Sequence, residues 1–206
     1  MVYRVFVSHP IASAALANRV VRALEVLPTL RGFVATEDLY VGRPWFEALT
    51  DQLMSCNALV AFIAPGFRES TWCDQEVGYV LGRGKKVLPV EFSRVPIAPH
   101  GFLGRYQAIN GYEKSDRHLA DRIFDALYAD ESERPELIAS VLEALRVGRD
   151  PGRLRLWAGR LLIAGPGLNG DQRANVDQIL RLNPLVRTDP NLYATIRRAL
   201  ADGEPR

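Results

Sequence analysis

Hydrophobic and polar residues follow two different periods along the first part of the chain. Residues 3–8 and 32–35 are short β-rich runs, and the segment between them, residues 11–27, repeats apolar residues at helical spacing. Residues 45–57 show the same helical spacing, while residues 58–64 are apolar without interruption. An unbroken apolar run is typical of a central strand that is covered on both faces. The pattern therefore predicts strand, helix, strand, helix and a buried strand.

The alternation continues to residue 129. Residues 70–81 are expected to form a helix, and residues 87–92 a strand whose Pro89 suggests an irregular end. Residues 106–109 are predicted to form a short edge strand, and residues 116–129 a helix. Strands that alternate with helices in this way predict an α/β fold with a doubly wound, mainly parallel sheet.

Strand signals end near residue 133, and the remaining chain shows only helical spacing. This predicts two domains, residues 1–130 and a small all-helical extension at residues 133–206, which is expected to dock on the first domain and to govern partner choice. The predicted helices of the extension are one that ends near Gly148 and those at residues 154–163, 171–182 and 190–200.

Composition narrows the function classes. Apolar residues make up 48% of the 206 residues, charged residues 24%, and the net charge is +2, as in an ordinary soluble globular protein. No cluster of Lys and Arg is interleaved with aromatic residues, so no nucleic-acid partner is expected. No apolar stretch approaches membrane-spanning length, and no membrane partner is expected. Cys56 and Cys73 lack metal-ligand spacing, which argues against a zinc site or a disulfide scaffold and favours a cytoplasmic protein.

The helix predicted at residues 70–81 carries the leading candidate for chemistry. Thr71 is expected to cap this helix, with Asp74 in its first turn. Trp72 and Glu76 then lie four residues apart on one face, at the border of an apolar stripe. A carboxylate held between an indole ring and an apolar seam is partly desolvated, as in many functional sites. The alternative is a rim glutamate beside a packed tryptophan. The predicted stripe contains Cys73, Val77, Val80, Leu81 and Gly84.

Further candidates follow the first two strands. Ser8 and His9 come just after the first strand, where open α/β sheets bind ligands. Asp38 and Arg43 belong to a polar loop at residues 36–44, and Trp45 follows it. Each also has an ordinary structural explanation: a histidine satisfied by backbone, solvated loop charges, and a tryptophan packed in the core.

Four segments of the sequence, in order, resemble the conserved boxes of TIR (Toll/interleukin-1 receptor) domains over residues 1–130. The segments resemble those of bacterial immune TIR proteins such as the enzymes of Thoeris anti-phage defence. One departure is Arg4, where the first box usually has an aspartate. The segments are Phe6-Val7-Ser8-His9, Gly42-Arg43-Pro44-Trp45 with Leu49 and Cys56, Ser70-Thr71-Trp72-Cys73-Asp74-Gln75-Glu76 and, more weakly, Gly101-Phe102-Leu103.

The resemblance implies a flavodoxin-like, five-stranded parallel sheet. It also implies an enzyme that cleaves the nicotinamide–ribose bond of NAD+, as a nucleosidase or an ADP-ribosyl cyclase, with Glu76 as the catalytic carboxylate. NAD+ would be the substrate rather than a bound cofactor, and the implied partners are other TIR domains and a downstream nucleotide-sensing effector. The candidate substrate-binding residues are Ser8, His9, Asp38, Arg43, Trp45 and Trp72.

Two other functions are compatible with the same residues. The chain could be a non-enzymatic TIR interaction module that assembles through the loop at residues 36–44. It could also be an enzyme related to nucleoside deoxyribosyltransferases, in which a glutamate attacks the sugar directly. Retention of Trp72 together with Glu76 favours the NAD+-consuming enzyme over the interaction module.

Overall fold

The structure, a computed structural model, describes residues 2–35, 45–95 and 101–201, without the side chains of Trp45 and Phe46. The chain divides into two compact units. The sheet unit contains Val2–Val26 and Leu30–Leu127, and the helical unit contains Leu27–Thr29 and the chain from Tyr128 onward.

The sheet unit is built on five parallel strands in the order β2-β1-β3-β4-β5. This is the strand order of flavodoxin-like folds, and it confirms the predicted doubly wound α/β class. The strand order reverses direction between β1 and β3, so a crevice is expected beyond the carboxyl ends of these two strands. The strands are β1 (Tyr3–Ser8), β2 (Leu30–Val34), β3 (Ala58–Ile63), β4 (Lys86–Glu91) and β5 (Ile109–Asn110).

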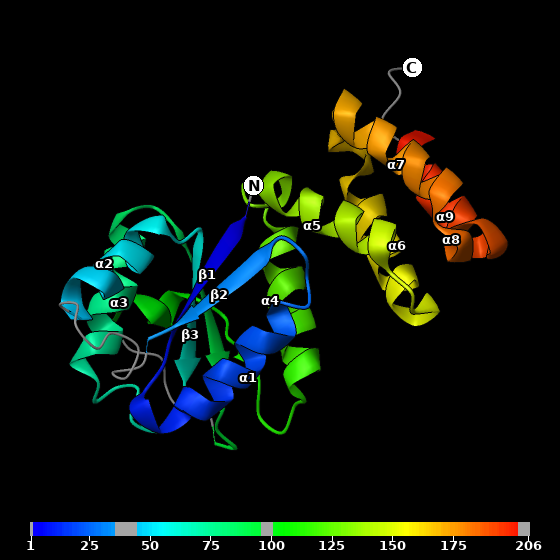
Figure 1. Cartoon of the computed structure of the whole chain (residues 1–206). Coiled ribbons are helices and arrows are strands. Elements are labelled where there is room, and N and C mark those ends of the chain that lie inside the picture. The colour runs from blue at the N-terminus through cyan, green and yellow to red at the C-terminus, as the bar shows by residue number, and fades with distance from the viewer. Residues whose placement is uncertain (1, 36–44, 96–100, 202–206) are drawn as a thin grey trace. The chain divides into compact units, whose positions relative to one another are not determined.

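Helices cover both faces of the sheet (Figure 1). The helices α2 (Trp45–Ser55) and α3 (Thr71–Gly82) lie on one face, and α1 (Ala14–Leu24) and α4 (Asp116–Ala129) lie on the other. A short 3-10 turn, η1 (Ile11–Ser13), precedes α1. All six residues of β3 are buried, as expected for the apolar central strand. The core under α2 and α3 includes Phe6, Leu49, Leu53, Leu59, Phe67, Cys73, Val77 and Val80.

Two predictions about the later strands were wrong. Pro89 lies inside β4, paired in register with Ala61, and β4 continues regularly to Glu91. The proline is tolerated because β5 joins β4 only from Val90 onward, so no pairing with β5 needs its missing N–H group. The edge strand is also shorter and later than predicted, at Ile109–Asn110, because only these two residues pair with β4, at Val90 and Glu91. The 3-10 turn η3 (Gly101–Arg105) precedes it.

The helical unit is a bundle of short helices. Its core contains Leu137, Val141, Leu145, Leu154, Trp157, Leu161, Val176, Ile179, Val186, Leu192 and Ile196. The elements are α5 (Arg134–Val147), α6 (Pro151–Ala164), η4 (Gly165–Gly167), α7 (Gly170–Leu182), α8 (Pro184–Thr188) and α9 (Pro190–Ala201).

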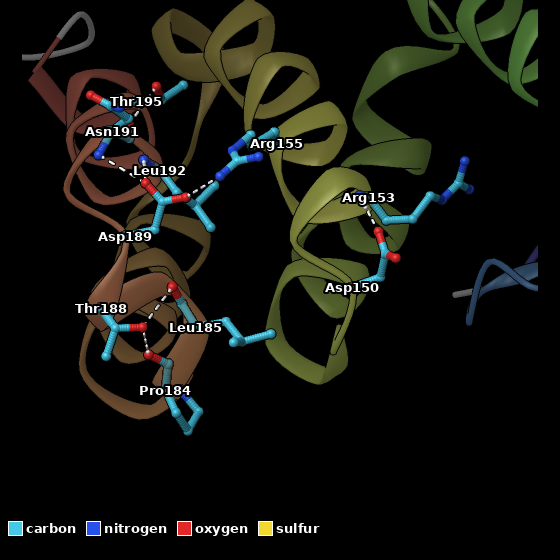
Figure 2. Close-up of polar contacts among 10 residues, drawn as sticks. All are labelled: Asp150, Arg153, Arg155, Pro184, Leu185, Thr188, Asp189, Asn191, Leu192 and Thr195. Carbon is cyan, nitrogen blue, oxygen red and sulfur yellow. Dashed lines mark hydrogen bonds and ion pairs between the residues drawn. The ribbon is translucent and has the colours of Figure 1, made fainter.

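Side-chain caps define where several of these helices begin. Asp150 accepts a hydrogen bond from the N–H of Arg153 at 2.6 Å at the start of α6 (Figure 2). Asp189 accepts bonds from the first N–H groups of α9, at Asn191 and Leu192, and pairs with Arg155 of α6 at 2.7 Å. These backbone N–H groups and the Arg155 guanidinium hold the pKa of Asp189 below its usual value. The Asp189–Arg155 pair therefore links α9 to α6.

Sequence periodicity missed the helix α8. Its cap is Asn183, whose side-chain oxygen accepts from the N–H groups of Leu185 and Val186, while its amide nitrogen donates to the carbonyls of Leu145 and Gly148. Five residues are too few to show a helical period, and this helix depends on contacts with distant chain. None of the described helices combines the length and apolar character needed to cross a lipid bilayer.

Candidate functional site

The connection between β3 and α3 fixes the position at which the helix begins. Gly66 has a positive φ of 91°, a conformation that side chains rarely adopt, and Phe67 is fully buried directly after it. The N–H of Phe67 bonds to the carbonyl of Ala64 at 3.0 Å. A buried ring and a glycine turn therefore set the position at which α3 begins.

The helix α3 is capped one residue earlier than predicted. The Ser70 hydroxyl oxygen accepts the N–H of Cys73 at 3.3 Å, so Ser70, and not Thr71, is the N-cap. Asp74 lies in the first turn, as expected from the helix dipole. Of the predicted apolar stripe, Cys73, Val77 and Val80 are buried, whereas Gly84 lies beyond the end of the helix and is exposed.

Glu76 is buried in the sheet unit, with 6% of its surface exposed. Burial is the main cause that raises the pKa of its carboxyl group to about 7, because an apolar environment disfavours the charged form. The Ser8 hydroxyl acts in the opposite direction and favours the carboxylate. A carboxyl group whose pKa lies near neutrality can exist in either protonation state under physiological conditions.

Ser8 ends β1, next to β3 at the point where the strand order reverses. Its hydroxyl is buried and makes no hydrogen bond of ordinary geometry to a described atom. The same hydroxyl influences the pKa values of both Glu76 and Cys73, so these three side chains are neighbours. A buried hydroxyl in this position can bond the Glu76 carboxylate, a ligand or water.

His9 follows Ser8 and is partly buried. Its Nδ1 lies 2.9 Å from the carbonyl oxygen of Pro10, which can only accept, so Nδ1 carries the proton in this contact. Nε2 is buried without a hydrogen-bond partner among the described atoms. The backbone contact predicted as the alternative for His9 is therefore present, and one ring nitrogen still lacks a partner.

A small cavity lies between α2 and α3. Its volume is about 150 Å³, and Glu76 forms part of its wall. Trp72 lines the same cavity and is 43% exposed, so it is not the packed core residue of the alternative reading. The described lining residues are Leu49, Thr50, Leu53, Trp72, Gln75, Glu76 and Tyr79.

The structure places some of the sequence candidates and leaves others undescribed. Glu76 and Trp72 share the cavity, and Ser8 lies beside Glu76. Asp38 and Arg43 lie outside the described residues, as does the side chain of Trp45. The other five described cavity residues were not predicted as site residues, and they are Leu49, Thr50, Leu53, Gln75 and Tyr79. Tyr79 lies three residues after Glu76 on the helix, so helical spacing from Glu76 could have identified it.

The arrangement suits the stabilisation of positive charge. A carboxylate in a water-poor site interacts more strongly with a cation than one in bulk water. The aromatic rings of Trp72 and Tyr79 add walls that favour a flat or cationic group. Within the described ranges, no cluster of His, Cys, Asp and Glu side chains is arranged to hold a metal ion.

Comparisons with known proteins give the family. The family model described as "TIR domain" matches residues 5–128, which is more than half of the chain. The TIR domain of the Toll-related receptor TRR-2 from Hydra magnipapillata is 19% identical, with a TM-score of 0.48, over 61% of this chain and 98% of that chain. The TIR domains of the activated Roq1 resistosome, which recognises the pathogen effector XopQ, are 16% identical, with a TM-score of 0.40, over 97% of this chain and 98% of that chain. No curated protein sequence matches the chain significantly.

Proposed function

This chain belongs to the TIR domain family, and we propose that its sheet unit cleaves the nicotinamide–ribose bond of NAD+ with Glu76 as the essential carboxylate. The TIR family includes both NAD+-cleaving enzymes and scaffold modules. The observation that favours the enzyme is the buried Glu76 carboxyl group in the wall of a cavity that Trp72 and Tyr79 also line.

The chemistry needs a fixed negative charge. Cleavage of the N-glycosidic bond moves its electron pair onto nicotinamide, which leaves as a neutral base, and develops positive charge on the ribose. The Glu76 carboxylate would stabilise this charge or hold the ribose hydroxyl groups. Attack by water would then give ADP-ribose, and attack by a nucleophile of the same molecule would give a cyclic nucleotide.

The size of the cavity suggests which part of NAD+ it receives. At about 150 Å³, it is smaller than the ~300–1,000 Å³ typical of sites for whole ligands. We therefore assign it to the nicotinamide ring and the adjoining ribose, with Trp72 and Tyr79 against the ring. Ser8 and His9, together with Asp38, Arg43 and Trp45, remain the proposed contacts for the rest of the substrate.

One incubation separates the candidate activities. The full chain is mixed with NAD+ or with a deoxynucleoside, and the released base and the nucleotide products are resolved by chromatography. Release of nicotinamide from NAD+ alone supports the proposal. Release of base from the deoxynucleoside supports the transferase-like alternative, and release from neither supports the interaction module.

The pH dependence of kcat/KM is the first prediction. Only the ionised form of Glu76 can stabilise a cation, so kcat/KM should rise as pH increases through about 7, falling roughly tenfold per pH unit well below that value. The measurement is initial rate at low NAD+ concentration between pH 5 and 9, with buffers of constant ionic strength. A flat profile across this range would contradict the role assigned to the Glu76 carboxylate.

The second prediction contrasts two tryptophans. Trp72→Ala should raise KM for NAD+ at least tenfold while costing only about 1 kcal/mol of stability, because its side chain is 43% exposed at the cavity. Trp157→Ala, its control, should leave KM unchanged but cost about 3–5 kcal/mol, since Trp157 is 3% exposed under the Arg160 guanidinium of the helical unit. Urea unfolding and steady-state kinetics measure both effects. A large loss of stability with unchanged KM for Trp72→Ala would contradict the proposed ring contact.

Self-association through the sheet unit is the second part of the proposal. The loop at residues 36–44, which lies outside the described residues, is its proposed contact, and a downstream effector that senses the product nucleotide is the proposed partner. The bacterial anti-phage role and a cytoplasmic location are proposed with it. Sequence resemblance supports the self-association, the effector and the anti-phage role, and the spacing of Cys56 and Cys73 supports the cytoplasmic location.

A further inference from the structure

A second, larger groove lies on the sheet unit, and none of its described lining residues belongs to the Glu76 cavity. Its volume is about 390 Å³, within the range of about 300–1,000 Å³ that small-molecule sites occupy. The later turns of α3 and the turn η3 form its walls. The described lining residues are Gly78, Leu81, Gly82, Gly84, Lys85, Phe102, Arg105 and Tyr106.

Glycines keep the α3 side of the groove open. Gly78 and Gly82 are four residues apart and therefore lie on one face of the helix. A Cβ atom added at either position would have no described atom of another element within 4 Å. Among the described residues no packing contact explains these two glycines, and any larger side chain at Gly78 would project into the groove.

The charges of the groove have one sign. Lys85 and Arg105 line it, and none of its described lining residues is acidic. A groove with two cationic side chains and no carboxylate attracts an anion. Its other polar group is the Tyr106 side chain, which can donate a hydrogen bond to an anionic oxygen.

Aromatic rings provide a flat surface beside these charges. The Arg105 guanidinium carbon lies 5.7 Å from the ring centre of Phe102 and 5.9 Å from that of Tyr106, so both rings help to orient it. Phe102 is 59% exposed, a large apolar surface at the rim of a charged groove. Exposed aromatic rings of this kind stack on nucleobases with little preference among them.

We propose that this groove binds a nucleoside monophosphate or a similar small anion with a flat ring. The phosphate lies between Lys85 and Arg105, and the base stacks on Phe102. The proposal is independent of NAD+ cleavage, because neither Glu76 nor any other residue of the Glu76 cavity takes part.

Calorimetric titration of the full chain with AMP tests the site. Adenosine, which lacks the phosphate, and inorganic phosphate, which lacks the ring, should each bind at least tenfold more weakly than AMP. In NMR spectra of the backbone amides, the largest chemical-shift changes induced by AMP should occur at Gly78, Gly82 and Gly84. No heat of binding with AMP at ~1 mM, or shifts centred on Glu76, would overturn the proposal.

A matched pair of variants locates the anion. Arg105→Gln should weaken AMP binding at least tenfold, whereas Arg83→Gln, which removes the same charge from a nearby side chain outside the groove, should change it less than twofold. Gly78→Leu should block binding by filling the groove. If Arg105→Gln and Arg83→Gln weakened AMP binding equally, the cause would be the loss of net positive charge and not the loss of a contact in the groove. That result would overturn the proposal.

One further variant separates this site from the catalytic one. Glu76→Gln should bind AMP as the wild type does. Loss of AMP binding in Glu76→Gln with retention in Arg105→Gln would assign AMP to the Glu76 cavity and overturn the proposal, without affecting the proposed NAD+ cleavage.

Discussion

Glu76→Gln is expected to abolish nicotinamide release from NAD+, lowering kcat by a factor of about 10²–10³ or more. The amide has nearly the same shape as the carboxyl group, but it cannot carry the negative charge that stabilises the cationic ribose. Because the buried environment of Glu76 already disfavours the ionised carboxylate, the neutral replacement should leave the fold intact. Chromatographic assay at pH 8 measures the loss.

The same variant should be more stable than the wild type at high pH. The pKa of Glu76 is raised from 4.5 to about 7 in the folded protein, so the folded state holds the proton more tightly than the unfolded state. Stability contributed by the neutral carboxyl group is therefore fully present below pH 4.5 and is lost as pH rises through about 7. Above pH 7 this loss is at most about 3 kcal/mol, and Glu76→Gln should not suffer it.

Glu69→Gln is the matched control. Glu69 is exposed in the turn before α3, so its replacement makes the same change in charge without touching the cavity. It should retain full activity and show the pH dependence of stability of the wild type. If Glu76→Gln kept full turnover, Glu76 would not be the catalytic carboxylate.

Gly165→Ala is expected to destabilise the helical unit by about 2–3 kcal/mol. Gly165 has ordinary helical backbone angles, so alanine meets no backbone strain there. The cost comes from contact, because an added Cβ would lie 2.6 Å from the carbonyl oxygen of Ala199 and 3.1 Å from its Cα. Both atoms belong to the backbone of α9 and can move away only if the helix moves.

Gly159→Ala, six residues earlier in α6, provides the comparison. A Cβ at Gly159 meets no described atom of another element within 4 Å, and an interior helical glycine costs about 0.5–1 kcal/mol relative to alanine. This variant should therefore raise the urea midpoint, while Gly165→Ala should lower it. Equal midpoints for the two variants would mean that α9 shifts at almost no cost.

Sequence patterns predicted the elements whose burial is local and periodic. The residues of β1 and α4 follow clear strand and helix spacing, and both elements have the predicted bounds. The elements that were missed or misplaced depend on contacts with residues far away in the sequence. The helix α8 needs the contacts of Asn183 with α5, and the two residues of β5 are a strand only because Val90 and Glu91 lie beside them.

The candidate site shows the same division. Helical spacing correctly placed Trp72 and Glu76 on one face, and both line the cavity. Whether Trp72 is packed or exposed depends on how closely α2 approaches α3. The spacing of residues within α3 carries no information about that distance. The raised pKa of Glu76 likewise depends on the packing that surrounds it, of which the sequence shows only the apolar neighbours.

The two cysteines, both buried and neither in a disulfide, provide a natural kinetic probe of the cavity walls. Cys56 directly follows α2, and Cys73 lies in the first turn of α3. Burial raises the pKa values of both thiols, so alkylating reagents reach a reactive thiolate only when the surrounding chain opens. Mass spectrometry can measure the alkylation rate of each cysteine without any introduced label. The two rates would report separately the free energies of local opening around the end of α2 and the start of α3.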